Sequence, residues 1–249
     1  LQGQPALIEK LLPVQKLSAE AYKEQEGKQS KTLTTLGSYW KGRKPLILAK
    51  ACVLGSLLPA TDNPTRDLEL FEKLMGMDSK SLVKRLVEQN DTPSRLFLAQ
   101  HRQAGLNASY RQIVEVAARP EDCDDHLFDH IWDEVNAHFG TSAHSFQELV
   151  AQLGGMRFGH RPLVADTFCG SGQIPFEAAR LGCDAFGSDL NPIACMLTWG
   201  AFHIVGGDAV YRAGLEQAQQ ALAAAVQTEL DALGIETDGA GWKPKTFLY

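Results

Sequence analysis

The sequence predicts an α/β fold, namely the opening of a Rossmann-like, doubly wound sheet preceded by a helical N-terminal elaboration. Three observations predict it. After Arg161, two short apolar runs each end on an acid, Asp166 and Asp189, and a helical pattern follows each acid. A glycine-containing turn joins the first run to its helix. Before Arg161, apolar residues recur at spacings of three and four, which is the period of an amphipathic helix rather than of a strand.

The first of three expected parts is an N-terminal segment, residues 1–60. Residues 5–12 are predicted to form a short amphipathic helix, and the polar residues 18–31 are predicted to be exposed. Pro45 marks the start of an apolar helix that ends near Pro59, because proline tolerates the first helical turn but not the interior. The helix is apolar all round, so it is expected to be largely buried.

The second part is a helical insertion or subdomain, residues 61–160, and the third is the first part of the sheet core, residues 161–249. In the insertion, the helical period is clear over residues 67–75, 79–89, 127–139 and 146–153. In the core, strands are expected over 162–166 and 183–188, and helices over 173–181, 191–202 and 208–233. The last seven residues, 243–249, look like the entrance to another strand, so we expect the chain to be a fragment of a longer protein.

Composition indicates an ordinary globular protein of the cytoplasm. Hydrophobic residues make up 44% of the 249 residues and charged residues 22%. No apolar run approaches the roughly 20 residues that cross a bilayer, and the start lacks the basic and apolar regions of a secretory signal. The five cysteines are odd in number and form no Cys-x-x-Cys pair, which argues against a disulfide framework. Cys123, His126 and His130 have metal-like spacing but no clear fourth ligand, so no metal is expected.

The net charge of −6 excludes a protein that grips nucleic acid over its whole surface. Charge is uneven, however. Between Lys23 and Lys50 there are six Lys and one Arg against two Glu. This stretch can meet phosphates, but a solvated face is the favoured interpretation.

The segment from Asp166 to Ala178, DTFCGSGQIPFEA, carries the clearest functional signal. Gly170 and Gly172 allow a tight turn and a close approach of a ligand to the backbone. The helix that follows directs free N–H groups towards the ligand. Asp189 comes 23 residues after Asp166, which places it at the tip of the neighbouring strand, where a carboxylate can accept both ribose hydroxyls of a nucleotide.

The same segment indicates which nucleotide is bound. A dinucleotide site requires a third glycine in Gly-x-Gly-x-x-Gly, and that position holds Pro175. S-adenosyl-L-methionine has no pyrophosphate but carries an ammonium group, which suits Asp166. Taken singly, the acid can be a turn carboxylate and the glycines an ordinary strand-to-helix turn. Taken together, they predict S-adenosyl-L-methionine as the cofactor.

Several segments resemble a known family. The motif from Asp166 to Gly182, followed by Ser188-Asp189-Leu190-Asn191-Pro192-Ile193-Ala194, resembles adenine-specific DNA methylases. Trp40-Lys41-Gly42-Arg43-Lys44-Pro45-Leu46 is similar to a segment of one subgroup, which opens with an N-terminal domain of unknown function and is often linked to anti-phage defence. Residues 130–136 and 156–162 also have the look of this subgroup, and residues 61–120 resemble it least.

The resemblance implies a DNA methyltransferase that modifies the exocyclic amine of adenine, in a bacterial anti-phage or restriction-modification setting. Its partners would be DNA and other defence-system proteins, with no membrane. Trp40 and Arg43 would fold back onto the methionine end of the cofactor. The expected cofactor-binding residues are Asp166, Phe168, Cys169, Gly170, Ser171, Gly172, Asp189, Leu190, Asn191, Trp40 and Arg43.

One part of such an enzyme is missing from the sequence. Amino methylation of a base requires an Asp/Asn-Pro-Pro-aromatic loop, and no such tetrapeptide occurs. No catalytic residue is therefore expected in this chain, which should be inactive alone. An RNA methyltransferase and a non-catalytic cofactor-binding or target-positioning module remain alternatives. For Cys169 packing is favoured over catalysis, and for Asp208 a helix N-cap is favoured over contact with the cofactor.

Overall fold

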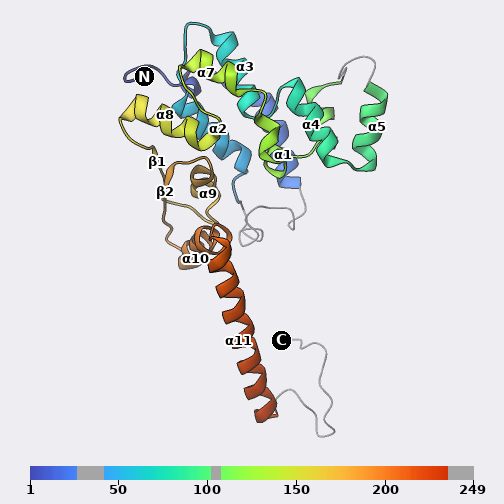
Figure 1. Cartoon of the computed structure of the whole chain (residues 1–249), viewed down its shortest axis with the longest axis vertical. Coiled ribbons are helices and arrows are strands. Elements are labelled where there is room, and N and C mark those ends of the chain that lie inside the picture. The colour runs from blue at the N-terminus through green and yellow to red at the C-terminus, as the bar shows by residue number, and fades with distance from the viewer. Residues whose placement is uncertain (27–41, 102–107, 235–249) are drawn as a thin grey trace. The chain divides into compact units, whose positions relative to one another are not determined.

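The computed structural model describes residues 1–26, 42–101 and 108–234, and the chain forms two compact units, Leu1–Ala201 and Phe202–Tyr249 (Figure 1). The first unit has a hydrophobic core that draws on residues from Leu7 to Cys183. This core joins all three parts expected from the sequence. The boundaries at residues 60 and 160 stay a prediction.

The N-terminal segment departs from the expected helix. Instead of a helix over residues 5–12, the chain makes one 3₁₀ turn, Leu7–Glu9. The flanking backbone pairs with the chain after α2: Leu7 N donates to Leu58 O over 2.9 Å, and Ala60 N donates to Pro5 O over 2.9 Å. Proline has no N–H and crowds the preceding turn, so the prolines at positions 5 and 13 confine any helix between them. The predicted helix is therefore wrong.

Helix α1 (Val14–Glu26) is a second departure, because one of its faces is buried although residues 18–31 were predicted to be exposed. Leu17 and Ala21 pack into the core, and Glu20 and Glu24 are buried with them. Glu24 is buried because it caps the next helix, where its Oε1 accepts a hydrogen bond of 2.8 Å from Leu46 N. Polar side chains on this face of α1 are thus buried because they have specific hydrogen-bond partners inside the protein.

Helix α2 (Leu46–Leu57) confirms the expected buried helix. Nine of its twelve residues are buried, and it packs against α1, α8 (Phe146–Phe158) and α9 (Gln173–Arg180) (Figure 1). An apolar cavity of about 480 Å³ separates it from the first strand, and Leu48, Cys52, Leu163 and Val164 are among the residues that line it. Helix α2 therefore packs against the sheet region mainly by its contact with α9.

The expected helical region is confirmed between residues 61 and 160. Its helices are α3 (Pro64–Leu74), α4 (Ser79–Gln89), α5 (Thr92–His101), α6 (Tyr110–Val116), α7 (Trp132–Phe139) and α8 (Phe146–Phe158), with 3₁₀ turns at Pro120–Asp122 and Asp125–Phe128. Side chains cap five of the N-termini, namely Asn63, Asp78, Asp91, Ser109 and Ser145. Each accepts a backbone N–H that has no partner within its helix, which fixes where these helices begin.

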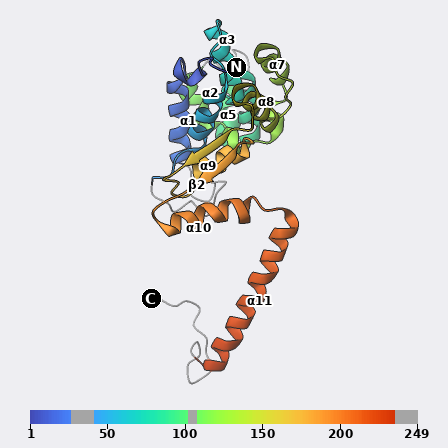
Figure 2. The same cartoon turned by 90° about the vertical axis from the view of Figure 1, so that its left-hand side faces the viewer.

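A strand–helix–strand–helix unit follows, close to the expected boundaries: β1 (Leu163–Asp166), α9 (Gln173–Arg180), β2 (Asp184–Gly187) and α10 (Pro192–Gly200). The strands are parallel, with Leu163 opposite Asp184 and Asp166 opposite Gly187. Helix α9 packs on both strands (Figure 2). These elements form one β-α-β crossover, the unit from which doubly wound sheets are built. The described residues contain two strands, so the complete Rossmann-like fold stays a prediction.

Lys50 lies inside the first unit, and the solvated face expected for residues 23–50 is wrong at this position. The residue is 3% exposed, and its Nζ lies 4.5 Å from the ring centroid of Phe128 and 4.0 Å from that of Phe146. Burial lowers the pKa of Lys50 to about 8, against the opposing influence of the nearby carboxylates Glu177 and Glu121.

Stability is expected to rise with pH where Lys50 titrates. The unfolded chain keeps the proton up to the ordinary pKa of 10.5, whereas the folded protein releases it near pH 8. The unfolded state therefore binds more protons in this window, and this group adds up to about 1.4 kcal/mol of stability per pH unit. Urea unfolding of the native protein and of Lys50→Met, below and within the window, measures the effect. The free energy of unfolding of the native protein should rise relative to that of the variant as pH rises, and a constant difference would contradict the prediction.

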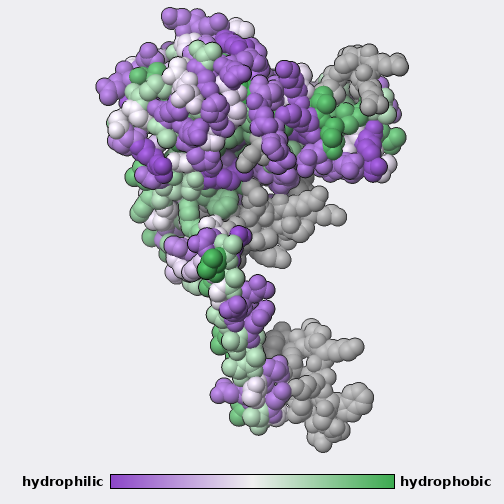
Figure 3. All heavy atoms as spheres, in the orientation of Figure 1, coloured by the Kyte–Doolittle hydropathy of each residue, from purple (hydrophilic) through white to green (hydrophobic). Residues whose placement is uncertain are grey.

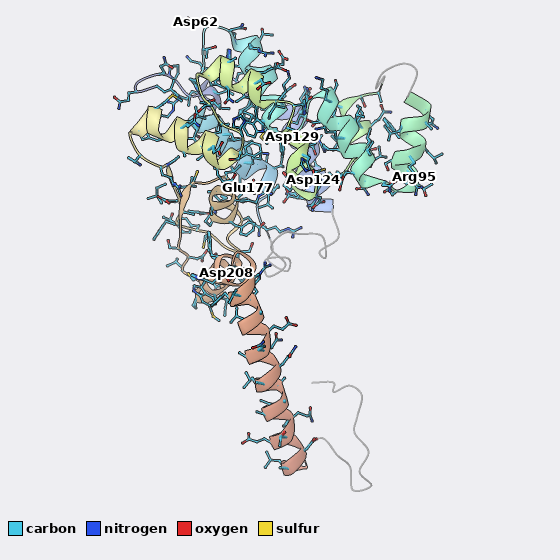
Figure 4. All side chains as sticks on the ribbon, in the orientation of Figure 1. Asp62, Arg95, Asp124, Asp129, Glu177 and Asp208 are labelled. Atoms are coloured by element: carbon cyan, nitrogen blue, oxygen red, sulfur yellow. The ribbon has the colours of Figure 1, made fainter. Side chains whose placement is uncertain are left out.

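In its described residues, the second unit contains one long helix, α11 (Ala209–Leu233). Asp208 caps it, since its Oδ1 accepts a hydrogen bond of 2.7 Å from Tyr211 N (Figure 4). The favoured N-cap interpretation of Asp208 is thereby confirmed. No helix within the described ranges is both long enough and apolar enough to cross a membrane.

Candidate cofactor-binding site

The glycine loop between β1 and α9 is tied to the end of both strands. Cys169 N donates to Ser188 O over 3.0 Å, and Ser188 N donates to Asp166 O over 2.9 Å. Phe168 N donates to Oδ1 of Asp166 over 3.1 Å. Gly170 and Gly172 have φ of 52° and 76°, the left-handed region that glycine adopts without strain. The loop is thus held in one shape by hydrogen bonds to the strand ends and by its two glycines.

Asp189 follows β2 and holds the tip of this loop. Its Oδ2 accepts a hydrogen bond of 3.0 Å from Gly170 N, and its Oδ1 accepts one of 2.9 Å from Asn191 N. These two N–H groups hold the pKa of Asp189 below its ordinary value, and the N–H of Asn191 has the larger effect. Each carboxylate oxygen has a further lone pair, so the group can still accept hydroxyl donors. Next to it, Leu190 is 93% exposed, and Asn191 caps α10 through Ile193 N.

A cavity of about 250 Å³ brings the glycine loop together with the chain ahead of α2. Its lining consists of Gly42, Arg43, Lys44, Asp166, Phe168, Cys169, Gly170, Ser171, Gln173 and Ile174. More than a hundred residues separate the two segments in sequence. Residues 42–44 thus lie beside the glycine loop, in the segment that the resemblance expects to fold back onto the cofactor. Trp40 lies outside the described residues.

Not every predicted residue faces this cavity. Gly172 lies behind the loop, where a Cβ would come within 2.7 Å of Thr198 Oγ1. Asp189, Leu190 and Asn191 are not part of the lining. Asp189 still reaches the site through Gly170, whereas Leu190 and Asn191 belong to the open surface beside it.

Arg43 supplies a cation to the cavity, and its charge also acts on the buried Glu24 carboxylate. Its Nη1 is buried and has no hydrogen-bond partner among the described residues. A buried guanidinium nitrogen without a hydrogen-bond partner is costly, and carboxylate is the group that matches the guanidinium geometry. Asp166, on the opposite wall, supplies a carboxylate. The cavity therefore offers charges of both signs, Arg43 and Lys44 against Asp166, which fits the α-carboxylate and α-amino groups of S-adenosyl-L-methionine.

Gly42, Lys44, Gln173 and Ile174 complete the lining, although they were not singled out from the sequence. Gly42 and Lys44 lie within the Trp40–Leu46 segment, so that motif pointed to them. Gln173 and Ile174 open α9 directly after the loop, and the first turn of such a helix is where free N–H groups meet a ligand.

The structure also bears on Cys169. This residue is buried, and its Sγ lies 3.2 Å from Thr198 Oγ1. Burial raises the pKa of the thiol, which lowers its nucleophilicity at neutral pH. Both findings agree with packing, the favoured interpretation.

The side chains with metal-like spacing have separate partners. Nδ1 of His126 pairs with Asp129 over 2.9 Å, and Nε2 of His130 pairs with Asp78 over 3.2 Å. Cys123 Sγ donates to Arg119 O over 3.4 Å. Among the described residues, no group of three or more His, Cys, Asp or Glu side chains has the arrangement of a metal site.

Comparison with known families finds one match. Residues 11–74 match a family described as a protein of unknown function, DUF1156. The expected N-terminal domain of unknown function is therefore confirmed over this range, which includes α1, α2, α3 and the Arg43 side of the cavity. No curated protein and no solved structure matches the chain.

Proposed function

We propose that this chain is the cofactor-binding part of an S-adenosyl-L-methionine-dependent methyltransferase that acts on the exocyclic amine of adenine in DNA. One observation carries the cofactor proposal: the cavity that joins Arg43 to the glycine loop and Asp166. The nucleic-acid substrate rests on the resemblance of the Asp166–Gly182 and Asp189–Ala194 motifs to adenine-specific methylases.

Each end of the cofactor has a complementary group in this arrangement. Arg43 pairs with the carboxylate of the methionine end, and Asp166 accepts from its ammonium group. Asp189, at the tip of β2, accepts from the ribose hydroxyls. The cofactor itself supplies an electrophilic methyl group on a sulfonium. The protein's contribution is to bind and orient it, with the backbone of Gly170 and Ser171 close to the ligand.

A non-catalytic binding module is the second candidate, and the Asp/Asn-Pro-Pro-aromatic loop, which the 249 residues do not contain, is the feature that distinguishes the two. Both candidates require cofactor binding. Calorimetric titration with S-adenosyl-L-methionine, with its demethylated product and with NAD⁺ tests that shared step. We expect the first two to bind and NAD⁺ not to bind, and the reverse preference would contradict the proposal. A DNA or RNA methylation assay on the 249-residue chain is expected to show no transfer.

The two ends of the ligand are expected to depend on different residues. Arg43→Ala should weaken S-adenosyl-L-methionine binding by about ten- to hundredfold, because a charge-assisted hydrogen bond is worth about 1.5–3 kcal/mol. It should leave binding of methylthioadenosine, which lacks the amino-acid end, unchanged. Asp189→Ala should weaken both ligands by a similar factor, because both carry the ribose.

Asp184→Ala is the matched control, since this exposed acid begins the same strand at the opposite end. It should change neither affinity by more than about twofold. Equal losses of affinity for both ligands in Arg43→Ala would show that Arg43 does not bind the carboxylate of S-adenosyl-L-methionine. Unchanged affinities in a folded Asp189→Ala variant would show that Asp189 does not bind the ribose hydroxyls.

A further inference from the structure

Helix α11 presents apolar side chains to solvent along its whole length. None of its residues is buried, and Tyr211, Leu222, Val226 and Leu233 are 45%, 66%, 48% and 69% exposed. Figure 3 shows apolar residues among the polar ones along this helix. Long helices gain most of their stability by packing an apolar face, so we expect the apolar face of α11 to pack against a partner.

The residues of this face form a repeating pattern, which we call the α11 seam. It consists of Tyr211, Leu215, Ala218, Leu222, Val226, Glu229 and Leu233. The successive spacings are four, three, four, four, three and four, so these residues share one side of the helix. The spacings are the same from either end, and Leu222 is the centre of symmetry.

A seam that is symmetric about its centre matches itself when two copies run in opposite directions. Leu222 then meets Leu222 of the second helix, and Ala218 meets Val226. Further out, Tyr211 meets Leu233 and Leu215 meets Glu229. In a parallel pair, Glu229 would face Glu229 within an apolar seam, which is unfavourable because like charges lie close together in a poorly solvated place.

The charges of the helix favour the same direction. Arg212 is the single Lys or Arg between residues 209 and 233. It precedes Leu215 by three residues, so in the antiparallel arrangement it lies within reach of Glu229 of the second copy. Two-fold symmetry creates this ion pair twice. The seam carboxylate thus gains a cation that the parallel arrangement does not give it.

We propose that α11 is a self-association surface, which pairs with α11 of a second copy of this chain in the antiparallel direction about a two-fold axis at Leu222. The proposal concerns the second unit and does not depend on the cofactor site.

Sedimentation equilibrium of the 249-residue chain tests the association. We expect a dimer that dissociates on dilution. Leu222→Glu should raise its dissociation constant by at least about a hundredfold, because two carboxylates replace a central apolar contact. Ala224→Glu is the matched control, since this position lies about 200° around the helix from Leu222. It should change the constant by less than about threefold. A monomer at all concentrations, or equal effects of the two substitutions, would overturn the proposal.

Charge exchange tests the direction. Arg212→Glu and Glu229→Arg should each weaken the dimer by about tenfold, because each brings like charges together in both copies. The double variant restores opposite charges and should recover the native constant to within about threefold. In a parallel pair, residue 212 faces residue 212, so the double variant would not recover. Circular dichroism of each variant verifies that α11 remains helical. Failure of the double variant to recover would overturn the antiparallel arrangement.

Discussion

Replacing Arg85 with methionine is expected to lower the free energy of unfolding by about 3–5 kcal/mol, the cost of leaving a buried charge without its partner. Arg85 on α4 and Glu20 on α1 are both almost fully buried, with side chains 0% and 1% exposed. Two parallel hydrogen bonds of 2.7 and 2.8 Å join the guanidinium group to the carboxylate. Removal of Arg85 would strand the Glu20 carboxylate in the core.

Further groups depend on the same guanidinium. It donates to Ala118 O over 2.7 Å and to Gly76 O over 2.9 Å, while Tyr110 Oη donates to Glu20 over 2.6 Å. Arg85→Met therefore also leaves two buried carbonyls without a donor. The double variant Arg85→Met/Glu20→Met removes the stranded charge as well and is expected to be more stable than Arg85→Met alone.

Urea unfolding measures both effects. Arg111→Met is the matched control, because the Arg111 side chain is 83% exposed and its Nε lies 3.6 Å from Oε1 of Glu115. Its cost should stay within about 0.5 kcal/mol. A loss below about 1 kcal/mol for Arg85→Met would mean that the site relaxes or admits water, and would contradict a dry, paired network.

The contrast between Arg85 and Arg111 shows what sequence patterns do not predict. Both lie on helices, and both have acids nearby in the chain. Helical periodicity is a pattern of apolar residues, and it cannot reveal that Glu20 and Arg85 meet across 65 positions. For this reason the polar face of α1 was predicted to be exposed. The same limit applies to Glu24, whose partners are the backbone N–H groups of a later helix.

Prediction succeeded where local chemistry fixes the structure. The strand ends at Asp166 and near Asp189, the glycine turn and the N-cap at Asp208 each depend on residues a few positions apart. It failed at residues 5–12, where pairing with the chain after α2 replaces the helix. That pairing spans about fifty residues, and no local pattern records it.

The candidate site divides in the same way. Its glycine loop was predicted from the spacing of Gly170, Gly172 and Asp189. The Arg43 side was predicted from a resemblance, since nothing in the residues themselves connects positions 42–44 to the loop. The buried Nη1 of Arg43, which has no hydrogen-bond partner among the described residues, is a property of the fold alone. Glu177 is similar: it sits on α9 close to α2 (Figure 4), fully buried and paired with Arg180 over 2.8 Å, which a surface-like Glu in sequence does not suggest.

Gly172→Ala is expected to destabilise the protein by about 2–5 kcal/mol and to weaken cofactor binding with it. Gly172 has a φ of 76°, which costs an L-residue about 1–2 kcal/mol. A Cβ here would also lie 2.7 Å from Thr198 Oγ1 and 3.0 Å from Thr198 Cα. Part of the obstruction is backbone of α10, so the loop must move, and overpacking of this kind costs about 1–3 kcal/mol.

Gly140→Ala separates the two causes. Gly140 ends α7 with a φ of 68°, and nothing lies within 4 Å of the position where its Cβ would be. It should therefore show the backbone cost of about 1–2 kcal/mol without a steric cost, and should leave cofactor affinity unchanged. Urea unfolding and calorimetric titration measure the two properties on the same samples.

A second substitution tests the steric cause directly. Thr198→Ala removes Oγ1 and Cγ2, two of the three atoms that crowd the new Cβ, but leaves Cα in place. Combined with Gly172→Ala, it should recover part of the lost stability and affinity, which makes the pair less destabilised than the sum of the single variants. Additive losses would show that Thr198 does not limit the loop. Equal costs for Gly172→Ala and Gly140→Ala would show that backbone conformation alone, rather than packing of the glycine loop on α10, requires glycine at position 172.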